Sequence, residues 1–244
     1  VRRVKMIIDE KTHGFKTRTV NSGPKWRLPW PPKYPDYYNK TCHYLDALYS
    51  TLVQLNPKYC LEIGTHKGDM STAVFQKYFS EHRTDGLLIT LDIKTCDGLS
   101  HPNVEQVLVY PHHNRIYETC GADGKWFAET ELPVDYKNVS TSSVQKNTDI
   151  VREAMDKHGI SGFDLAFIDG DHERESFLGD LEMCMSLTAS PHRVLIDDTK
   201  EEYHPCCHIY QEEIKTSEKY VTYDYDNWER FVGCSLVWAS EASE

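Results

Sequence analysis

Several apolar runs of this sequence contain or end in carboxylate side chains, and one imidazole stands among them. The residues concerned are Glu62, Asp92, Asp169, Asp171, His172, Asp197 and Asp198. Carboxylates that lie close together repel one another unless a cation neutralises them, and Mg²⁺ prefers carboxylate oxygens. A neutral imidazole, with an unperturbed pKa of about 6.5, accepts a proton near neutral pH. These residue types suit metal-assisted acid–base chemistry, provided that the fold brings them together.

The elements that must position these side chains alternate along the chain. The apolar patterns predict strands over residues 59–64, 87–92, 104–110, 163–170, 193–198, 220–225 and 234–239. Helical periodicity is found over residues 45–55, 68–81, 143–158, 173–188 and 206–218. Strands alternating with helices predict a mainly parallel sheet, and the last two strands, with no helix between them, are expected to form an edge hairpin.

Ligands of an open parallel sheet bind outside the carboxyl ends of its strands, where all the carboxylates above are expected to meet. The turn "LEIGTHKG" places Gly64 and Gly68 before a helix, where free N–H groups can face a ligand. His66 occupies the middle glycine position of a GxGxxG dinucleotide motif, which argues against an NAD site. Asp92 ends the next strand and is suited to a ribose diol, although it could instead cap its own turn.

Four segments together resemble the class I S-adenosylmethionine-dependent methyltransferases: "LEIGTHKGDMSTAV", "LITLDI", "FDLAFIDGDH" and "VLIDDT". Within that class the sequence is most similar to the metal-dependent small-molecule O-methyltransferases of the catechol, macrolide-sugar and cephalosporin-hydroxylase-like groups. The resemblance covers about residues 41–240. It implies an α/β, Rossmann-like methyltransferase fold with a seven-stranded sheet and helices on both faces. The implied cofactors are S-adenosylmethionine and Mg²⁺ or another divalent cation.

The resemblance also implies roles for individual residues. The cofactor-binding positions would be Glu62, Gly64, Thr65, Gly68, Ser71 and Asp92. The metal ligands would be Asp169, Asp197 and Asp198, and the catalytic residues would be Asp169 and His172. His172 stands where these families place a general base. Asp198 stands where the catechol group has Asn, and an Asp there suits the sugar-modifying groups better.

Other readings of these residues remain open at this point. Asp171 is expected to cap helix 173–188, and His172 could be an ordinary residue of its first turn. Two rival functions are an NAD-dependent oxidoreductase and a non-catalytic S-adenosylmethionine-binding protein. A nucleic-acid methyltransferase is disfavoured, because a net charge of −11 repels a phosphate backbone. The predicted acceptor is therefore a hydroxyl of a small molecule, such as a sugar or a glycosylated natural product.

Charge and composition divide the chain into an arm and a domain. Residues 1–40 carry ten Lys and Arg against three Asp and Glu and are rich in Pro and aromatic residues, so they are expected to form a basic N-terminal arm. The methyltransferase domain is expected over residues 41–244, with an insertion loop at about 111–141. An arm of this kind could join subunits of a homo-oligomer.

The compartment is predicted from what the sequence lacks. It has no apolar run of 18 residues and no secretory signal at its start, so no association with a membrane is expected. Its eight cysteines include no CxxC pair, and "HPCCH" at 204–208 is poorly spaced for structural zinc. We therefore expect a cytoplasmic protein with reduced thiols.

Overall fold

The computed structural model describes residues 4–9, 14–19, 43–68, 70–96, 99–109, 143–199, 205–225 and 234–239. The predicted insertion at 111–141, and residues 20–40 of the predicted arm, lie outside the described residues. Within the described ranges, no helix is long and apolar enough to cross a membrane.

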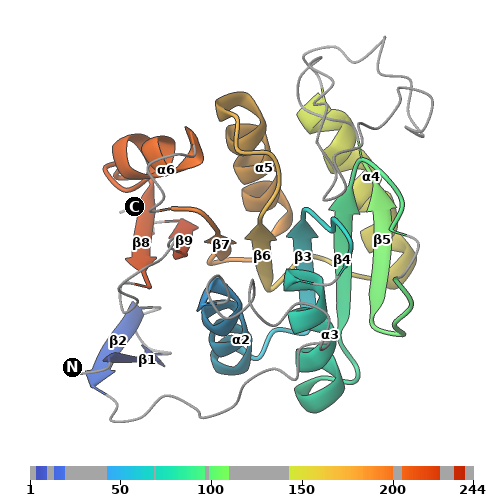
Figure 1. Ribbon diagram of the computed structural model, residues 1–244, viewed down its shortest axis with the longest axis horizontal. Coiled ribbons are helices and arrows are strands. Elements are labelled where there is room, and N and C mark those ends of the chain that lie inside the picture. The colour runs from blue at the N-terminus through green and yellow to red at the C-terminus, as the bar shows by residue number, and fades with distance from the viewer. Residues whose placement is uncertain are drawn as a thin grey trace, which may run out of the picture.

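The core of the molecule is a seven-stranded sheet with the order β5-β4-β3-β6-β7-β9-β8 (Figure 1). Its strands are β3 (Tyr59–Ile63), β4 (Leu87–Asp92), β5 (Val104–Leu108), β6 (Leu165–Ile168), β7 (Val194–Ile196), β8 (Tyr220–Asp224) and β9 (Ser235–Ala239). The first five strands of this order are parallel, and β9 runs antiparallel to both β7 and β8. The predicted fold, a mainly parallel sheet with an antiparallel hairpin at one edge, is confirmed.

Helices cover both faces of the sheet, as predicted. Helices α2 (His43–Leu55) and α3 (Ser71–His82) share one hydrophobic core with the sheet. Helices α4 (Ser143–His158), α5 (Arg174–Leu187) and α6 (Pro205–Ile209) share the other, together with the π-helix η3 (Tyr210–Ile214) that continues α6. The central strands are buried on both faces, which explains their nearly continuous apolar sequence.

The N-terminal residues contain a hairpin that the sequence did not predict. Strands β1 (Val4–Asp9) and β2 (Gly14–Thr19) pair antiparallel and form a separate two-stranded sheet. Their sequences, "VKMIID" and "GFKTRT", lack a clean alternation of apolar and polar residues, so periodicity carried little signal. The expected arm therefore begins with regular structure.

Most of the strands that lead to the candidate site are shorter than predicted. Gly64, Asp169 and Asp197 were placed inside strands, but β3, β6 and β7 end one residue before each of them. The first residue after each of these strands is therefore a candidate site residue. The predicted helix 206–218 is likewise split into α6 and the π-helix η3.

Candidate active site

The turn after β3 presses against the end of β6. Gly64 has a φ of +99°, and a Cβ atom at this position would lie 2.0 Å from the carbonyl oxygen of Asp169. Only glycine fits, both because of this contact and because the backbone is left-handed. The turn predicted to bind the cofactor is thereby held next to the first predicted metal ligand.

A buried network supports this turn from below. The hydroxyls of Thr90 and Thr72 donate hydrogen bonds to Oε2 of Glu62 at 2.6 and 2.7 Å, and Thr65 Oγ1 lies 2.7 Å from Thr90 Oγ1. Glu62 is fully buried, and burial raises its pKa to about 7 against the opposing effect of the threonine hydrogen bonds. The carboxyl group of Glu62 is thus connected to the turn through the hydroxyls of Thr90 and Thr65. A direct contact with the cofactor stays a prediction.

Asp92 holds the turn from the side. The backbone N–H of His66 donates to Asp92 Oδ2 at 2.7 Å, and that of Lys94 donates to Oδ1 at 3.2 Å. Burial raises the pKa of Asp92, although these backbone hydrogen bonds oppose the effect. His66 has a φ of +47°, so the residue at the middle position of the turn is left-handed without being glycine. The predicted role of Asp92 in binding a ribose is untested, but its carboxylate does lie beside the turn.

The other predicted cofactor positions lie at the same place in the fold. Gly68, with a φ of +70°, donates its N–H to the carbonyl of Thr65 at 2.8 Å. Ser71 is the first residue of α3 and is almost fully buried. All of the predicted cofactor positions therefore belong to one turn, the strand ends beside it and the first residue of α3.

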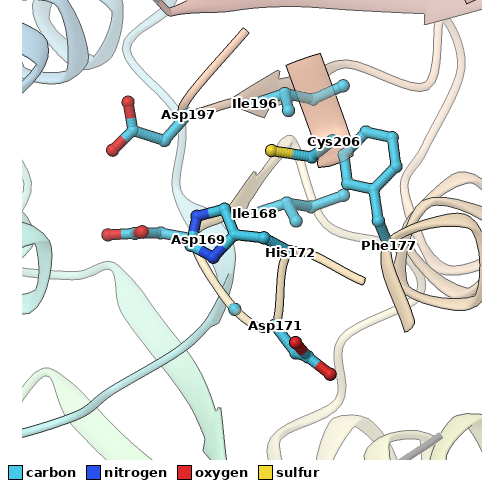
Figure 2. Close-up of a pocket in the computed structure, with 9 residues that line it drawn as sticks. Ile168, Asp169, Asp171, His172, Phe177, Ile196, Asp197 and Cys206 are labelled. Atoms are coloured by element: carbon cyan, nitrogen blue, oxygen red, sulfur yellow. The ribbon is translucent and has the colours of Figure 1, made fainter. Parts of the chain in front are cut away.

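The acidic cluster forms where β6 and β7 end. One ligand atom each of Asp169, His172 and Asp198 lie within 4.8 Å of one another. His172 Nε2 forms a hydrogen bond with Asp198 Oδ2. In Figure 2 the imidazole of His172 lies beside Asp169, and the carboxylates of Asp169 and Asp197 extend to the same side. The structure thus brings together two of the three predicted metal ligands and the predicted base.

Burial and mutual charge shift the pKa values of two residues in this cluster. Burial, together with the charge of Asp198, raises the pKa of Asp169 to about 8. Burial alone would lower the pKa of His172, but the hydrogen bond and charge of Asp198 outweigh it and raise this pKa above its ordinary value. Two carboxylates at this spacing fit a divalent cation, whose charge would favour the ionised form of Asp169.

Asp197 and Asp171 differ from this group. Asp197 lines the same pocket but is not one of the three residues whose ligand atoms cluster, so its predicted role as a metal ligand is untested. Asp171 points away from the cluster in Figure 2, and its carboxylate accepts hydrogen bonds from Glu173 N at 3.3 Å and Ser176 Oγ at 2.8 Å. The N-cap residue of α5 is Glu173, so the prediction that Asp171 is the cap itself was wrong. Its side chain nevertheless holds the first turn.

The pocket at the cluster has an apolar wall that the sequence did not reveal. Ile168, Phe177, Ile196 and Cys206 line it together with the acidic residues (Figure 2). Cys206 lies on α6 and its thiol donates to the carbonyl of Asp198 at 3.6 Å. The only signal for Cys206 in the sequence was its position shortly after the Asp pair, since adjacent cysteines suggested a different kind of site.

Comparison with known proteins assigns a family to this arrangement. Residues 61–199, more than half of the chain, match the family model described as a methyltransferase domain. The chain therefore belongs to this methyltransferase family, and the resemblance stated from its sequence is confirmed at that level. A search of curated proteins found no match.

Solved structures similar to this chain include three methyltransferases. A putative caffeoyl-CoA O-methyltransferase from Staphylococcus aureus is 13% identical, with 81% of this chain and 83% of that chain covered and a TM-score of 0.50. An O-methyltransferase from Bacillus cereus in complex with SAH is 14% identical, with 81% of each chain covered and a TM-score of 0.48. MycE, from the mycinamycin biosynthetic pathway and solved with Mg, SAH and mycinamycin VI, is 12% identical, with 83% of this chain and 50% of that chain covered and a TM-score of 0.47.

Proposed function

We propose that this methyltransferase transfers the methyl group of S-adenosylmethionine to a hydroxyl of a small molecule, with the assistance of Mg²⁺ or another divalent cation. The observation that carries the proposal is the contact between two parts of the site. The glycine turn at Gly64 abuts the backbone of Asp169, whose side chain lies within 4.8 Å of His172 and Asp198. A methyl donor bound on the turn would therefore lie next to groups that can activate a hydroxyl.

The cofactor would bind along the edge formed by the turn and β4. The N-terminus of α3 offers backbone N–H groups there, and Asp92 at the end of β4 is suited to the ribose hydroxyls. The buried threonines around Glu62 keep the turn in place before the cofactor arrives. Preorganisation of this kind reduces the entropy lost on binding.

His172 would take the proton of the acceptor hydroxyl. Asp198 accepts a hydrogen bond from the imidazole, orients the ring and stabilises the imidazolium that forms. The resulting oxyanion attacks the methyl carbon, the carbon–sulfur bond breaks, and its electron pair stays on sulfur, which leaves S-adenosylhomocysteine. A divalent cation, when bound, lowers the pKa of the acceptor hydroxyl. Asp169 and Asp198 would hold it, since a carboxylate has about four acceptor sites and Asp198 can bond His172 at the same time.

The charge of the chain supports the proposed class of acceptor. The net charge of the chain is −11, made up of +7 for residues 1–40 and −18 for the remainder. Anionic polymers are poor ligands for such a surface, whereas a sugar or a glycosylated natural product offers neutral hydroxyls. A hydroxyl oxygen of such an acceptor could contact both the proposed cation and the imidazole of His172.

The test is a transfer assay with S-adenosylmethionine labelled in the methyl group and a panel of sugars, glycosides and catechols. Label is expected on an acceptor oxygen. EDTA is expected to stop this transfer, and excess Mg²⁺ is expected to restore it. Transfer that continues unchanged in EDTA would refute the cation while leaving the methyl transfer standing. Transfer of the label only to carbon or nitrogen atoms of these compounds, and to none of their oxygens, would refute the proposed acceptor.

A further inference from the structure

The backbone of Asp198 has a conformation that its neighbours must enforce. Its φ is +55°, in the left-handed region that residues other than glycine seldom adopt. Such a conformation persists only where the surrounding structure holds it in place. The residues that hold it therefore decide where the Asp198 carboxylate points.

One set of contacts reaches the backbone from α6 and η3. The thiol of Cys206 donates to the carbonyl of Asp198 at 3.6 Å, and that of Cys207 donates to the carbonyl of Thr199 at 3.4 Å. Gln211 Nε2 also donates to the carbonyl of Thr199, at 2.9 Å. Gln211 belongs to the π-helix, a form that is rare and frequent at functional sites. Three side chains thus hold two consecutive carbonyls.

A second set of contacts reaches Thr199 through the sheet. Thr199 is fully buried, and its Oγ1 lies 2.8 Å from Oγ of Ser235, which is fully buried as well. Ser235 donates its hydroxyl hydrogen to Asp224 Oδ1 at 2.8 Å, so Thr199 must be the donor to Ser235. The strand register places Ser235 opposite Ile196 on one side and Asp224 on the other. A hydrogen-bonded chain therefore runs from Asp224 through β9 to the residue after Asp198.

Asp224 anchors the far end of this chain. Besides Ser235, Tyr210 donates its hydroxyl to Oδ1, and Lys215 Nζ donates to Oδ2. Burial alone would raise the pKa of Asp224, but these hydrogen bonds, led by that from Lys215, lower it. An ionised carboxylate is a strong acceptor, so the Ser235 hydroxyl is fixed in one orientation. The oxygen of Ser235 is then left to accept the hydrogen bond from Thr199, which fixes the Thr199 hydroxyl as well.

We propose that Thr199, Ser235 and Asp224 are positioning residues that fix the Asp198 carboxylate for cation binding. The inference rests on the proposed function, because its consequence is the affinity of that site for a divalent cation. None of the three residues is placed among the ligands or the catalytic groups. They act through the backbone of Asp198, as outer-shell partners of metal ligands do elsewhere.

The test compares two substitutions of Thr199 in the full chain. Thr199→Val removes the hydroxyl at nearly constant volume, whereas Thr199→Ser keeps it. Titration with MnCl₂, followed by the electron paramagnetic resonance signal of free Mn²⁺, measures affinity without any turnover. Thr199→Val is expected to weaken Mn²⁺ binding about tenfold, and Thr199→Ser to bind much as the wild type does.

A matched control separates positioning from general stability. Thr188→Val also removes a buried threonine hydrogen bond, from Thr188 Oγ1 to the carbonyl of Cys184 at 2.9 Å, near the end of α5 remote from the cluster. This variant is expected to lose stability but to keep its affinity for Mn²⁺. Equal losses of affinity in Thr188→Val and Thr199→Val would overturn the inference.

Asp224→Asn tests the same chain from its other end, in case Thr199→Val does not fold. It is expected to weaken Mn²⁺ binding in the same direction. Wild-type affinity in both Thr199→Val and Asp224→Asn would overturn the positioning chain while leaving the proposed function intact. If the wild type binds no Mn²⁺, the cation part of the proposed function fails and the inference fails with it.

Discussion

At the scale of single residues, neighbouring carboxylates of the site have different contacts and therefore different roles. Asp169 and Asp171 stand two positions apart, yet Asp169 lies in the cluster with a pKa of about 8, while Asp171 bonds the first turn of α5. The difference arises because Asp169 directly follows the buried strand β6, whereas Asp171 has reached the start of a helix. Asp169 and Asp171, although close in sequence, thus have different roles.

This difference can be measured with a matched pair of variants. Asp169→Asn removes a carboxylate from the proposed cation site, so metal-dependent methyl transfer is expected to fall by at least about a hundredfold, with the affinity for S-adenosylmethionine little changed. Asp171→Asn makes the same chemical change and is expected to keep most of the activity, because an amide can still accept from Glu173 N. Initial rates at saturating cofactor, with titration calorimetry for cofactor affinity, check both. Full activity in Asp169→Asn would contradict the assignment.

His172 predicts a pH dependence. A general base must be neutral, and the pKa of His172 is raised above its ordinary value by Asp198. Activity is therefore expected to rise with pH through an inflection above about 6.5, the value of an unperturbed imidazole. His172→Ala is expected to lower kcat far more than it alters KM and to abolish that inflection. An unchanged pH profile in the variant would mean that another group accepts the proton.

At the scale of elements, the site is made by the ends of strands rather than by the strands themselves. The turn after β3, the end of β6 and the end of β7 come together because these strands are neighbours in the sheet. Helix α6 and the π-helix η3 then close over the residues that follow β7. The tightest of these junctions is the contact between Gly64 and Asp169.

A methyl group added at that junction should be costly. Gly64→Ala combines a 2.0 Å approach to a backbone oxygen with a φ of +99°, so the free energy of unfolding is expected to fall by about 3 kcal/mol. Gly159→Ala is the control, because Gly159 has a φ of +65° but nothing within 4 Å of the added atom. Its cost should be about 1 kcal/mol, from the backbone alone. Chemical denaturation measures the free energy of unfolding of both variants. Equal losses of this free energy would contradict the packing argument.

The network under the turn predicts how stability changes with pH. The pKa of Glu62 is raised from 4.5 to about 7, so between these pH values the folded protein binds more protons than the unfolded chain. The contribution of this group to stability is full below pH 4.5 and is lost as the pH rises toward 7, by about 3 kcal/mol in all. Glu62→Gln should lack this loss. Urea denaturation of both proteins from pH 4 to 8 checks this, and parallel curves would contradict it.

The elements were largely predictable, and their long-range contacts were not. Strand β4 and helix α4 begin and end where the sequence patterns place them, because the periodicity of each is local. The pairing of His172 with Asp198 and that of Thr199 with Ser235 join residues 26 and 36 positions apart. Such contacts depend on the order of strands in the sheet, which local periodicity does not predict. The π-helix is likewise tied to distant parts of the chain, by hydrogen bonds from Gln211 to the carbonyl of Thr199 and from Tyr210 to Asp224.

At the scale of the whole molecule, strand order explains why one edge carries the chemistry. From β3 the chain proceeds through β4 to β5 on one side and returns to build β6 and β7 on the other (Figure 1). Ligands of doubly wound sheets bind where the order reverses, which here lies between β3 and β6. The turn that would bind the cofactor and the acidic cluster flank this point. The architecture therefore suits transfer between two ligands that meet at the centre of the sheet.

The central claim is tested most directly by calorimetric titration of the full chain with S-adenosylmethionine, S-adenosylhomocysteine and NAD, each with and without Mg²⁺. We predict that both S-adenosyl compounds bind at a single site, whether or not Mg²⁺ is present, and that NAD does not. The turn at Gly64 would supply that site, and the acidic cluster would act on the acceptor instead. Absence of binding by S-adenosylmethionine and S-adenosylhomocysteine, or binding of NAD in their place, would contradict the account.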